Sequence, residues 1–361
     1  MKDKSEDALL AIFDWLRFPL IIGVIFIHNH SVKTVECVTD SYGGYLVELF
    51  SQGIGRLSVP MFFFISGYLF FYRVDTFDRS VYAKKLKGRV KSLLAPYLIW
   101  NFLILSAYLA LYSLGLEKTK IDSGFGFASA VKAFVCPLAY QMWFVRDLFC
   151  VVLVSPLIFC LVSRFRVLYI CAISVLWILG LEIPVLGTYC LSMTSIFFFS
   201  FGAAFSVAGL NVLVVAEKVK IMAFLYPALL ILDLFSKSAI LHNIAILSGL
   251  FLIFLTCGYM AESGRLKPMP FLASSSFFIF AVHEPFLLTI NRKILLSLND
   301  SDSLYVTFSY FLAVGLTVAI SLGIYSLLSR FAPGLTALLT GGRRQRAASC
   351  STPDFYGRRG S

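Results

Sequence analysis

The sequence FDWLRFPLIIGVIFIHNH, residues 13–30, decides the class of fold, because it is long and apolar enough to cross a membrane as a helix. Roughly 20 apolar residues span the hydrocarbon core of a bilayer. Similar apolar stretches recur along all 361 residues, of which 59% are hydrophobic and only 14% charged. Soluble domains carry about 25% charged residues. The composition therefore predicts an all-α fold, a polytopic bundle of membrane helices.

The hydropathy pattern predicts ten spans, and an even number places both termini on the same side of the membrane. The predicted spans cover residues 10–30, 54–72, 92–114, 147–163, 167–182, 190–210, 220–235, 240–260, 271–290 and 304–328. Most of the 31 Lys and Arg residues then lie in the short segments on the side of the termini. Because basic residues near span ends collect on the cytoplasmic side, we expect both termini to be cytoplasmic.

One membrane domain is predicted over residues 1–335, followed by a disordered, basic cytoplasmic tail over residues 336–361. The tail is polar and rich in small residues. Acidic residues interrupt the N-terminal segment, so it is not interpreted as a secretory signal. The net charge of +11 follows from the basic loops, so it does not predict binding of nucleic acid. The cysteines show no Cys/His ligand spacing, so no metal is predicted, whereas a bridge between Cys37 and Cys136 stays open.

Arg17 and His28 lie on the same face of the first predicted span. They are eleven residues apart, and at ~100° per residue this separation amounts to about three full turns. A rise of ~1.5 Å per residue places His28 about 16 Å further from the cytoplasmic side than Arg17. His30 points away from that face. For Arg17, an alternative is an interface anchor that is paired with Asp14.

A second histidine, His283, lies at a similar depth in the ninth predicted span, FLASSSFFIFAVHEPFLL (271–288), with Glu284 next to it. Ionisable residues deep in a span usually face the bundle interior and commonly mark a pathway or a reaction site. The two histidines therefore predict a polar chamber in the outer half of the bundle. The alternatives are a buried, hydrogen-bonded histidine at His28 and a simple helix break at Glu284 and Pro285.

A basic cluster precedes the third span, in KKLKGRVK (84–91), and includes Lys87, Arg89 and Lys91. Such a cluster can set the topology or bind anionic membrane lipids. It can equally bind the phosphates of a cytoplasmic donor through charge-assisted hydrogen bonds.

Five motifs, in order, resemble the integral-membrane acyltransferase family 3. They are DWLR with the downstream histidine in the first span, FFFISGYL (62–69), RVKSLLAPYLIWN (89–101), MWFVRDL (142–148) and FFIFAVHEPFL (277–287). The resemblance covers about residues 10 to 330. It implies a ten-helix bundle of the bacterial inner membrane that uses cytoplasmic acyl-CoA, here expected to be acetyl-CoA. The acceptor that it implies is a hydroxyl of a cell-surface glycan or of its lipid-linked precursor.

The family's arginine and histidine in the first span fall on Arg17 and His28, which the resemblance implies to be essential. The predicted catalytic residues are His28, Arg17 and His283, and the predicted donor-binding residues are Arg17, Lys87, Arg89 and Lys91. A neutral imidazole can take the proton of a sugar hydroxyl as it attacks a thioester, so His28 is the expected general base. An acyl-histidine intermediate is an alternative mechanism. Two other functions stay open: a transporter or flippase for a glycan or lipid-linked sugar, and a receptor or scaffold without catalysis.

Overall fold

The computed structural model describes residues 2–38, 41–115, 135–186 and 189–342. The helical elements are α1 (Lys2–Asn29), α2 (Val32–Val38), α3 (Tyr42–Glu48), η1 (Leu49–Gly53), η2 (Ile54–Leu57), α4 (Ser58–Phe71), α5 (Arg79–Arg89), η3 (Val90–Leu94), α6 (Ala95–Ser113), η4 (Tyr140–Met142), α8 (Trp143–Leu153), α9 (Ser155–Ile178), α10 (Met193–Val207), α11 (Val212–Lys218), α12 (Lys220–Phe224), α13 (Tyr226–Ser236), α14 (Ala239–Glu262), α15 (Pro270–Val282), η5 (His283–Leu287), α16 (Leu288–Leu298), α17 (Ser303–Phe331) and α18 (Pro333–Thr340). Two short strands, β1 (Ile183–Leu186) and β2 (Tyr189–Leu191), pair antiparallel.

The described residues confirm a polytopic helix bundle. Seven helical segments among them are long and apolar enough to cross a membrane, or eight if α10 and α11, bent by 102°, form one span. The number ten is not confirmed. At the predicted boundary between the spans 147–163 and 167–182, α9 kinks at Phe165, whose backbone is not helical (φ −130°, ψ 32°). The predicted span 220–235 corresponds to the short helices α12 and α13.

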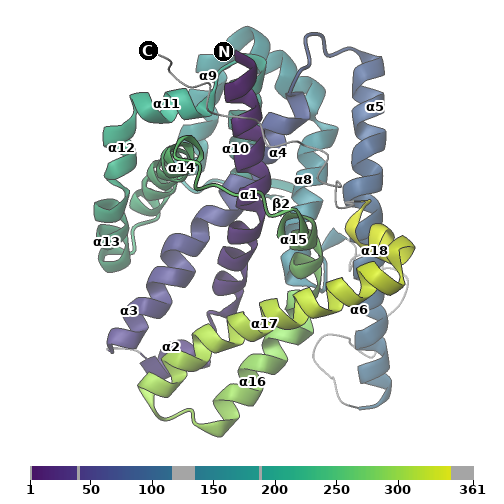
Figure 1. The fold of residues 1–361 in the computed structure, drawn as a ribbon, viewed down its shortest axis with the longest axis vertical. Coiled ribbons are helices and arrows are strands. Elements are labelled where there is room, and N and C mark those ends of the chain that lie inside the picture. Colours follow the sequence, from purple (N-terminus) through teal and green to yellow (C-terminus); the bar gives the residue numbers. More distant parts are fainter. Residues whose placement is uncertain (1, 39–40, 116–134, 187–188, 343–361) are drawn as a thin grey trace, which may run out of the picture.

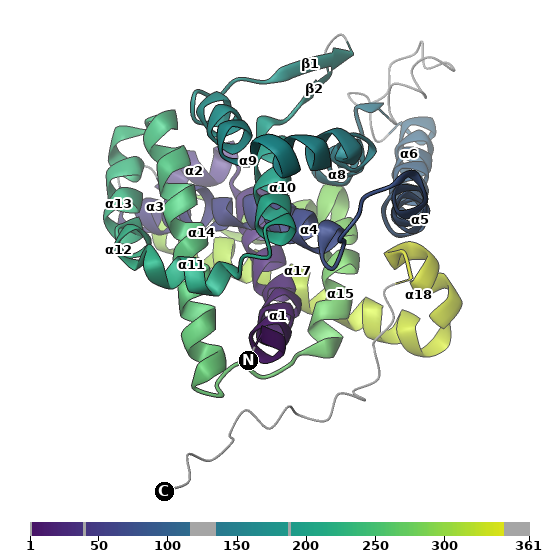
Figure 2. The same ribbon diagram turned by 90° about the horizontal axis from the view of Figure 1, so that it is seen from above.

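Helix α1 runs through the middle of the bundle, where α4, α14, α15 and α17 contact it (Figure 1). Seen from above, α8, α9 and α10 lie together on one side of α1 (Figure 2). Its apolar residues, such as Ile12, Phe13 and Ile25, are fully or almost fully buried. The central position of α1 explains why polar groups on it, including Arg17 and His28, are partly buried by the surrounding helices.

Helices α4 and α10 pack along each other and form the most extensive helix pair of the bundle. Two glycines allow this approach. A Cβ atom at Gly67 would lie 2.0 Å from the carbonyl oxygen of Phe199, and one at Gly202 would lie 2.0 Å from that of Phe64. Small residues let the backbones of membrane helices approach closely, which is why the FFFISGYL motif carries a glycine at this point. The contact between α4 and α10 holds α4 in position, with one of its faces toward the interior of the bundle.

A helix break follows α15, because Glu284 has an extended backbone (φ −123°, ψ 155°) inside η5. The break expected at this point is therefore present, and it accompanies the histidine site rather than replacing it.

Helix α18 covers Pro333–Thr340, so helical structure extends past residue 335. The domain boundary there stays a prediction, and residues 343–361 lie outside the described residues. Cys37 and Cys136 are both free thiols, so the structure contains no bridge between them.

Candidate active site

A cavity of about 210 Å³ opens inside the bundle, between α1, α4, η3, α8 and α15. It is lined by Arg17, Ile21, Val24, Val59, Phe62, Ile65, Ser66, Leu69, Arg89, Ser92, Leu93, Phe144, Val145, Leu148, Ala273, Ser276, Phe277 and Phe280. Most of these side chains are apolar, and three serines and two arginines supply the polar groups. The α1 residues recur at the spacing of one helix face, the face that also carries His28.

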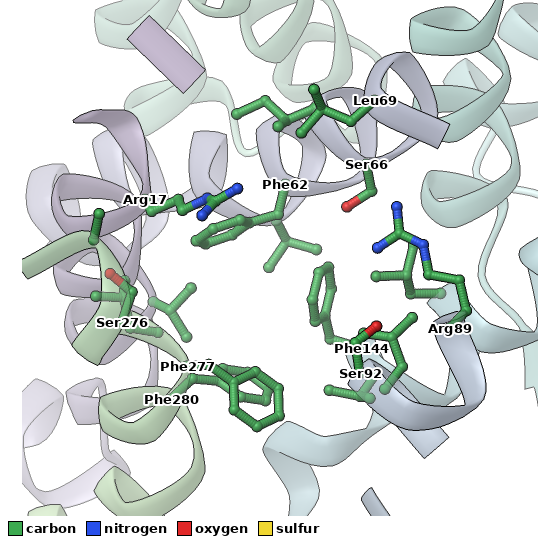
Figure 3. Close-up of a pocket in the computed structure, with 18 residues that line it drawn as sticks. Arg17, Phe62, Ser66, Leu69, Arg89, Ser92, Phe144, Ser276, Phe277 and Phe280 are labelled. Carbon is green, nitrogen blue, oxygen red and sulfur yellow. The ribbon is translucent and has the colours of Figure 1, made fainter. Parts of the chain in front are cut away.

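Arg17 and Arg89 lie on facing sides of the cavity, and their guanidinium groups turn toward it (Figure 3). Arg17 also makes an ion pair with Asp14, with 3.1 Å between Nη2 and Oδ1. Arg17 therefore makes the pair with Asp14 and also lines the cavity. Arg89 packs its guanidinium 5.7 Å from the ring centre of Phe70. The two cations make the end of the cavity near Arg17 suitable for an anionic group.

Lys87 and Lys91, the other two predicted donor-binding residues, do not line the cavity. Both are exposed, one on α5 and one on η3. Lys85, in the same basic cluster, donates from Nζ to the backbone carbonyl of Phe70 over 2.6 Å. That bond ties α5 to the end of α4, where the carbonyls of a helix lack partners in the helix itself.

The structure brings together His28 and His283, which the sequence places at a similar depth. Their ring centres lie 5.1 Å apart, with the rings at 68°. The Phe280 ring, which lines the cavity, is centred 6.0 Å from that of His283. One further turn of α1 leads from Val24, at the cavity wall, to His28. The histidines therefore adjoin the end of the cavity opposite the two arginines.

His283 is completely buried, and its hydrogen bonding fixes one ring nitrogen. Nδ1 donates to the backbone carbonyl of Phe280 over 2.8 Å. In a neutral ring the other nitrogen, Nε2, then carries a lone pair, and it has no hydrogen-bond partner among the described residues. A buried acceptor without a partner is costly in a folded protein, so its retention favours a functional role. His30 lies elsewhere: its Nε2 is 3.4 Å from Oε1 of Glu48.

Several residues around the histidines are absent from the sequence-based site. The ring centre of Tyr140 lies 5.7 Å from that of His28. Arg292 donates from Nη1 to the backbone carbonyl of His28 over 3.3 Å. Gln141 donates from Nε2 to the backbone carbonyl of Glu284. Tyr140 and Gln141 precede a predicted span and Arg292 follows one, so a search for polar residues inside spans misses all three.

The MWFVRDL motif holds the wall of the cavity in place. Asp147 is completely buried, and its Oδ1 accepts from Nε of Arg146 over 3.0 Å. Its other oxygen accepts from the backbone N–H of Ser192 over 3.1 Å, which ties α8 to the start of α10. Arg146 in turn donates to the carbonyl of Val135 over 2.8 Å. This network is structural, and it positions Phe144 and the other α8 residues that line the cavity.

Comparison with known proteins defines the class. The family model described as an acyltransferase domain matches residues 10–325, so the chain belongs to the acyltransferase 3 family. The protein is thus a multi-pass membrane acyltransferase, and this membership favours an enzyme over the transporter and scaffold alternatives. Among curated proteins, the chain is similar to "Succinoglycan biosynthesis protein ExoH" of Rhizobium meliloti (strain 1021). The two are 28% identical over 362 residues, which cover 91% of each chain. No solved structure matches the chain significantly.

Proposed function

We propose that this protein moves an acyl group, expected to be acetyl, from cytoplasmic acyl-CoA to a hydroxyl of a glycan or of its lipid-linked precursor. One observation carries the proposal: a single cavity has Arg17 and Arg89 at one end and adjoins His28 and His283 at the other. In acyl-CoA the anionic phosphates and the thioester lie at different ends of the pantetheine arm. This arrangement matches a cavity with arginines at one end and histidines at the other. A polysaccharide acceptor is supported by the relative that is named for succinoglycan biosynthesis.

The donor lies with its phosphates at Arg17 and Arg89 and its pantetheine arm along the apolar wall. The cavity of about 210 Å³ is smaller than the roughly 300–1,000 Å³ pockets that enclose drug-sized ligands. It therefore suits a narrow chain, and the adenine nucleotide stays outside at the cytoplasmic surface. The exposed Lys87 and Lys91 lie at that surface, where nucleotide phosphates or anionic lipid headgroups reach them.

His28 acts as the general base of the transfer. It takes the proton of the acceptor hydroxyl while the hydroxyl oxygen attacks the thioester carbonyl. The new C–O ester bond forms, the C–S bond breaks, and the proton passes from His28 to the departing CoA sulfur. His283, whose tautomer is fixed by Phe280, offers Nε2 as an acceptor beside His28 and positions the reacting groups. Arg17 aligns the donor from the same face of α1.

The orientation in the membrane is part of the proposal. Both termini lie in the cytoplasm, and the membrane is the inner membrane of a bacterium. The concentration of Lys and Arg in the segments on the side of the termini supports this orientation. Arg17 and Arg89 then open toward the cytoplasmic acyl-CoA, and the histidine site lies in the outer half of the bundle.

Replacing Arg17 or Arg89 with Gln should weaken the binding of CoA about 10- to 100-fold. Losing one charged hydrogen bond costs roughly 1.5–3 kcal/mol, and about 1.4 kcal/mol corresponds to a factor of ten. The measurement is the Kd of CoA for the purified full chain. The matched control is Arg79→Gln, an exposed residue of the same helix α5 that lies outside the cavity. Unchanged affinity in both cavity variants would place the donor elsewhere.

A further inference from the structure

We infer that Arg56 and Arg292 form a binding site for an anionic group of the acceptor, on the outer side of His28. The inference rests on the proposed function and deepens it, because it assigns a chemical class to the acceptor. The anionic group is a carboxylate or a phosphate, which a planar guanidinium binds through paired hydrogen bonds. Its sources are an acidic sugar of the glycan or the phosphate that links a glycan to a lipid carrier.

Arg56 comes from η2, which packs against α1. Its Nε donates to Oε1 of Gln52 over 2.9 Å, and Nη2 donates to the same oxygen. Gly55, the residue before Arg56, packs against α1 next to His28, because a Cβ atom at Gly55 would lie 3.0 Å from Cγ1 of Ile27. Arg56 is nevertheless exposed. A guanidinium has five N–H donors, so most of the donors of Arg56 stay available to a ligand.

Arg292 approaches His28 from a different element, α16. It is half-buried, and its Nη1 donates to the backbone carbonyl of His28 over 3.3 Å. A cation at the end of a helix stabilises the unpaired carbonyls there, so part of the role of Arg292 is to cap α1. That bond occupies one donor of five, and it holds the guanidinium beside the proposed base.

Neither arginine makes an ion pair within the described part of the chain, although two carboxylates lie nearby. Glu48 is 3.4 Å from Nε2 of His30, and Glu284 accepts from the hydroxyl of Thr289 over 3.1 Å. Buried cations are normally paired, so the half-buried Arg292, which makes no ion pair within the described residues, indicates a ligand of opposite charge beside the reaction site. The exposed Arg56 adds donors that such a ligand can reach. An acceptor that offers only uncharged hydroxyl groups would not require either arginine.

The position of the arginines assigns the anion to the acceptor rather than to the donor. The cavity for the donor approaches His28 from the side of Arg17, whereas Arg292 bonds to the carbonyl at the outer end of α1. Tyr140 lies on this outer side as well, and it is 72% exposed while its ring contacts that of His28. An exposed aromatic face beside the base offers an apolar platform for a sugar ring.

The test measures the melting temperature of the purified full chain with saturating CoA, so that the donor arginines are already occupied. The probes are glucose 1-phosphate, glucuronate and, as the uncharged control, glucose, at equal ionic strength. Specific binding to the folded state raises the melting temperature by mass action. We expect at least one anion to stabilise the parent while glucose does not. Arg56→Gln and Arg292→Gln should both lose the increase, and Lys293→Gln, an exposed neighbour, should keep it.

The two probes identify the source of the charge. A response to glucose 1-phosphate alone assigns the anion to the phosphate of a lipid-linked glycan, and a response to glucuronate alone assigns it to an acidic sugar. Arg292→Lys, which keeps the charge, should retain part of the increase and thereby separates ligand binding from damage to the fold. The inference is overturned if neither anion stabilises the parent, or if both Gln variants respond like the parent. The change in melting temperature that CoA alone causes is measured separately. It tests the donor site and the proposed function.

Discussion

Replacing His28 with Ala should reduce acyl transfer by ~10²–10⁴-fold while the protein still accumulates in the membrane, because a missing general base typically has an effect of this size. His28 is the residue that contacts His283, follows the cavity-lining face of α1 and lies next to Arg292. Insertion should persist, since alanine makes the first span more apolar. The measurement is acylation of surface glycans by mass spectrometry, normalised to the amount of protein in the membrane.

His30→Ala is the matched control, because His30 lies two residues away and contacts Glu48 rather than His283. It should change the normalised activity only slightly. His283→Ala should have an intermediate effect if His283 positions the reacting groups. An active His28→Ala variant beside an inactive His30→Ala variant would show that the catalytic histidine has been assigned to the wrong position.

Replacing Gly67 with Val should prevent the bundle from folding. The Cβ atom would lie 2.0 Å from the carbonyl oxygen of Phe199, and this oxygen belongs to the backbone of α10, so it cannot rotate away as a side chain would. Overpacking a core usually costs about 1–3 kcal/mol, and a clash between two helix backbones exceeds that range because both helices must separate. Loss of the α4 and α10 pair would also remove the α4 wall of the cavity.

The measurement is the yield of monodisperse protein after detergent extraction, together with its melting temperature. Gly315→Val is the matched control, because Gly315 lies in the membrane helix α17 and its Cβ would meet no atom within 4 Å. The control should extract and melt like the parent. Normal extraction and melting of Gly67→Val would show that the two helices are further apart than the structure places them.

The sequence predicts the class of fold and part of the site for identifiable physical reasons. Helical periodicity is enough to place Arg17 and His28 on one face, and the rise per residue is enough to match the depth of His283. The contact between His28 and His283 needs the packing of α1 against α15, which no single helix encodes. Arg56 escapes the sequence search because it lies in η2, in a segment predicted to begin an ordinary apolar span.

The number of spans is less predictable than their existence, because hydropathy does not show how a helix bends. The non-helical backbone at Phe165 lies at the predicted boundary between two spans, whereas the sharp bend between α10 and α11 comes at the end of the predicted span 190–210. In the same way, the sequence does not show which residues of the basic cluster face the cavity, as Lys87 and Lys91 illustrate. They share a basic cluster with Arg89, but the transition from α5 to η3 turns only Arg89 toward the cavity.

Photolabelling tests most directly whether the cavity carries the donor thioester from the cytoplasmic side to His28. An acyl-CoA with a photoreactive group at the end of its acyl chain is added to sealed inverted membrane vesicles, whose cytoplasmic face points outward, and the labelled peptides are mapped. We predict labels within residues 21–28 of α1 and within residues 277–283, where α15 passes into η5, and both should be reduced by excess CoA and by Arg89→Gln. Labels outside these segments, or equal labelling of sealed vesicles with the opposite orientation, would contradict the proposed path of the acyl group.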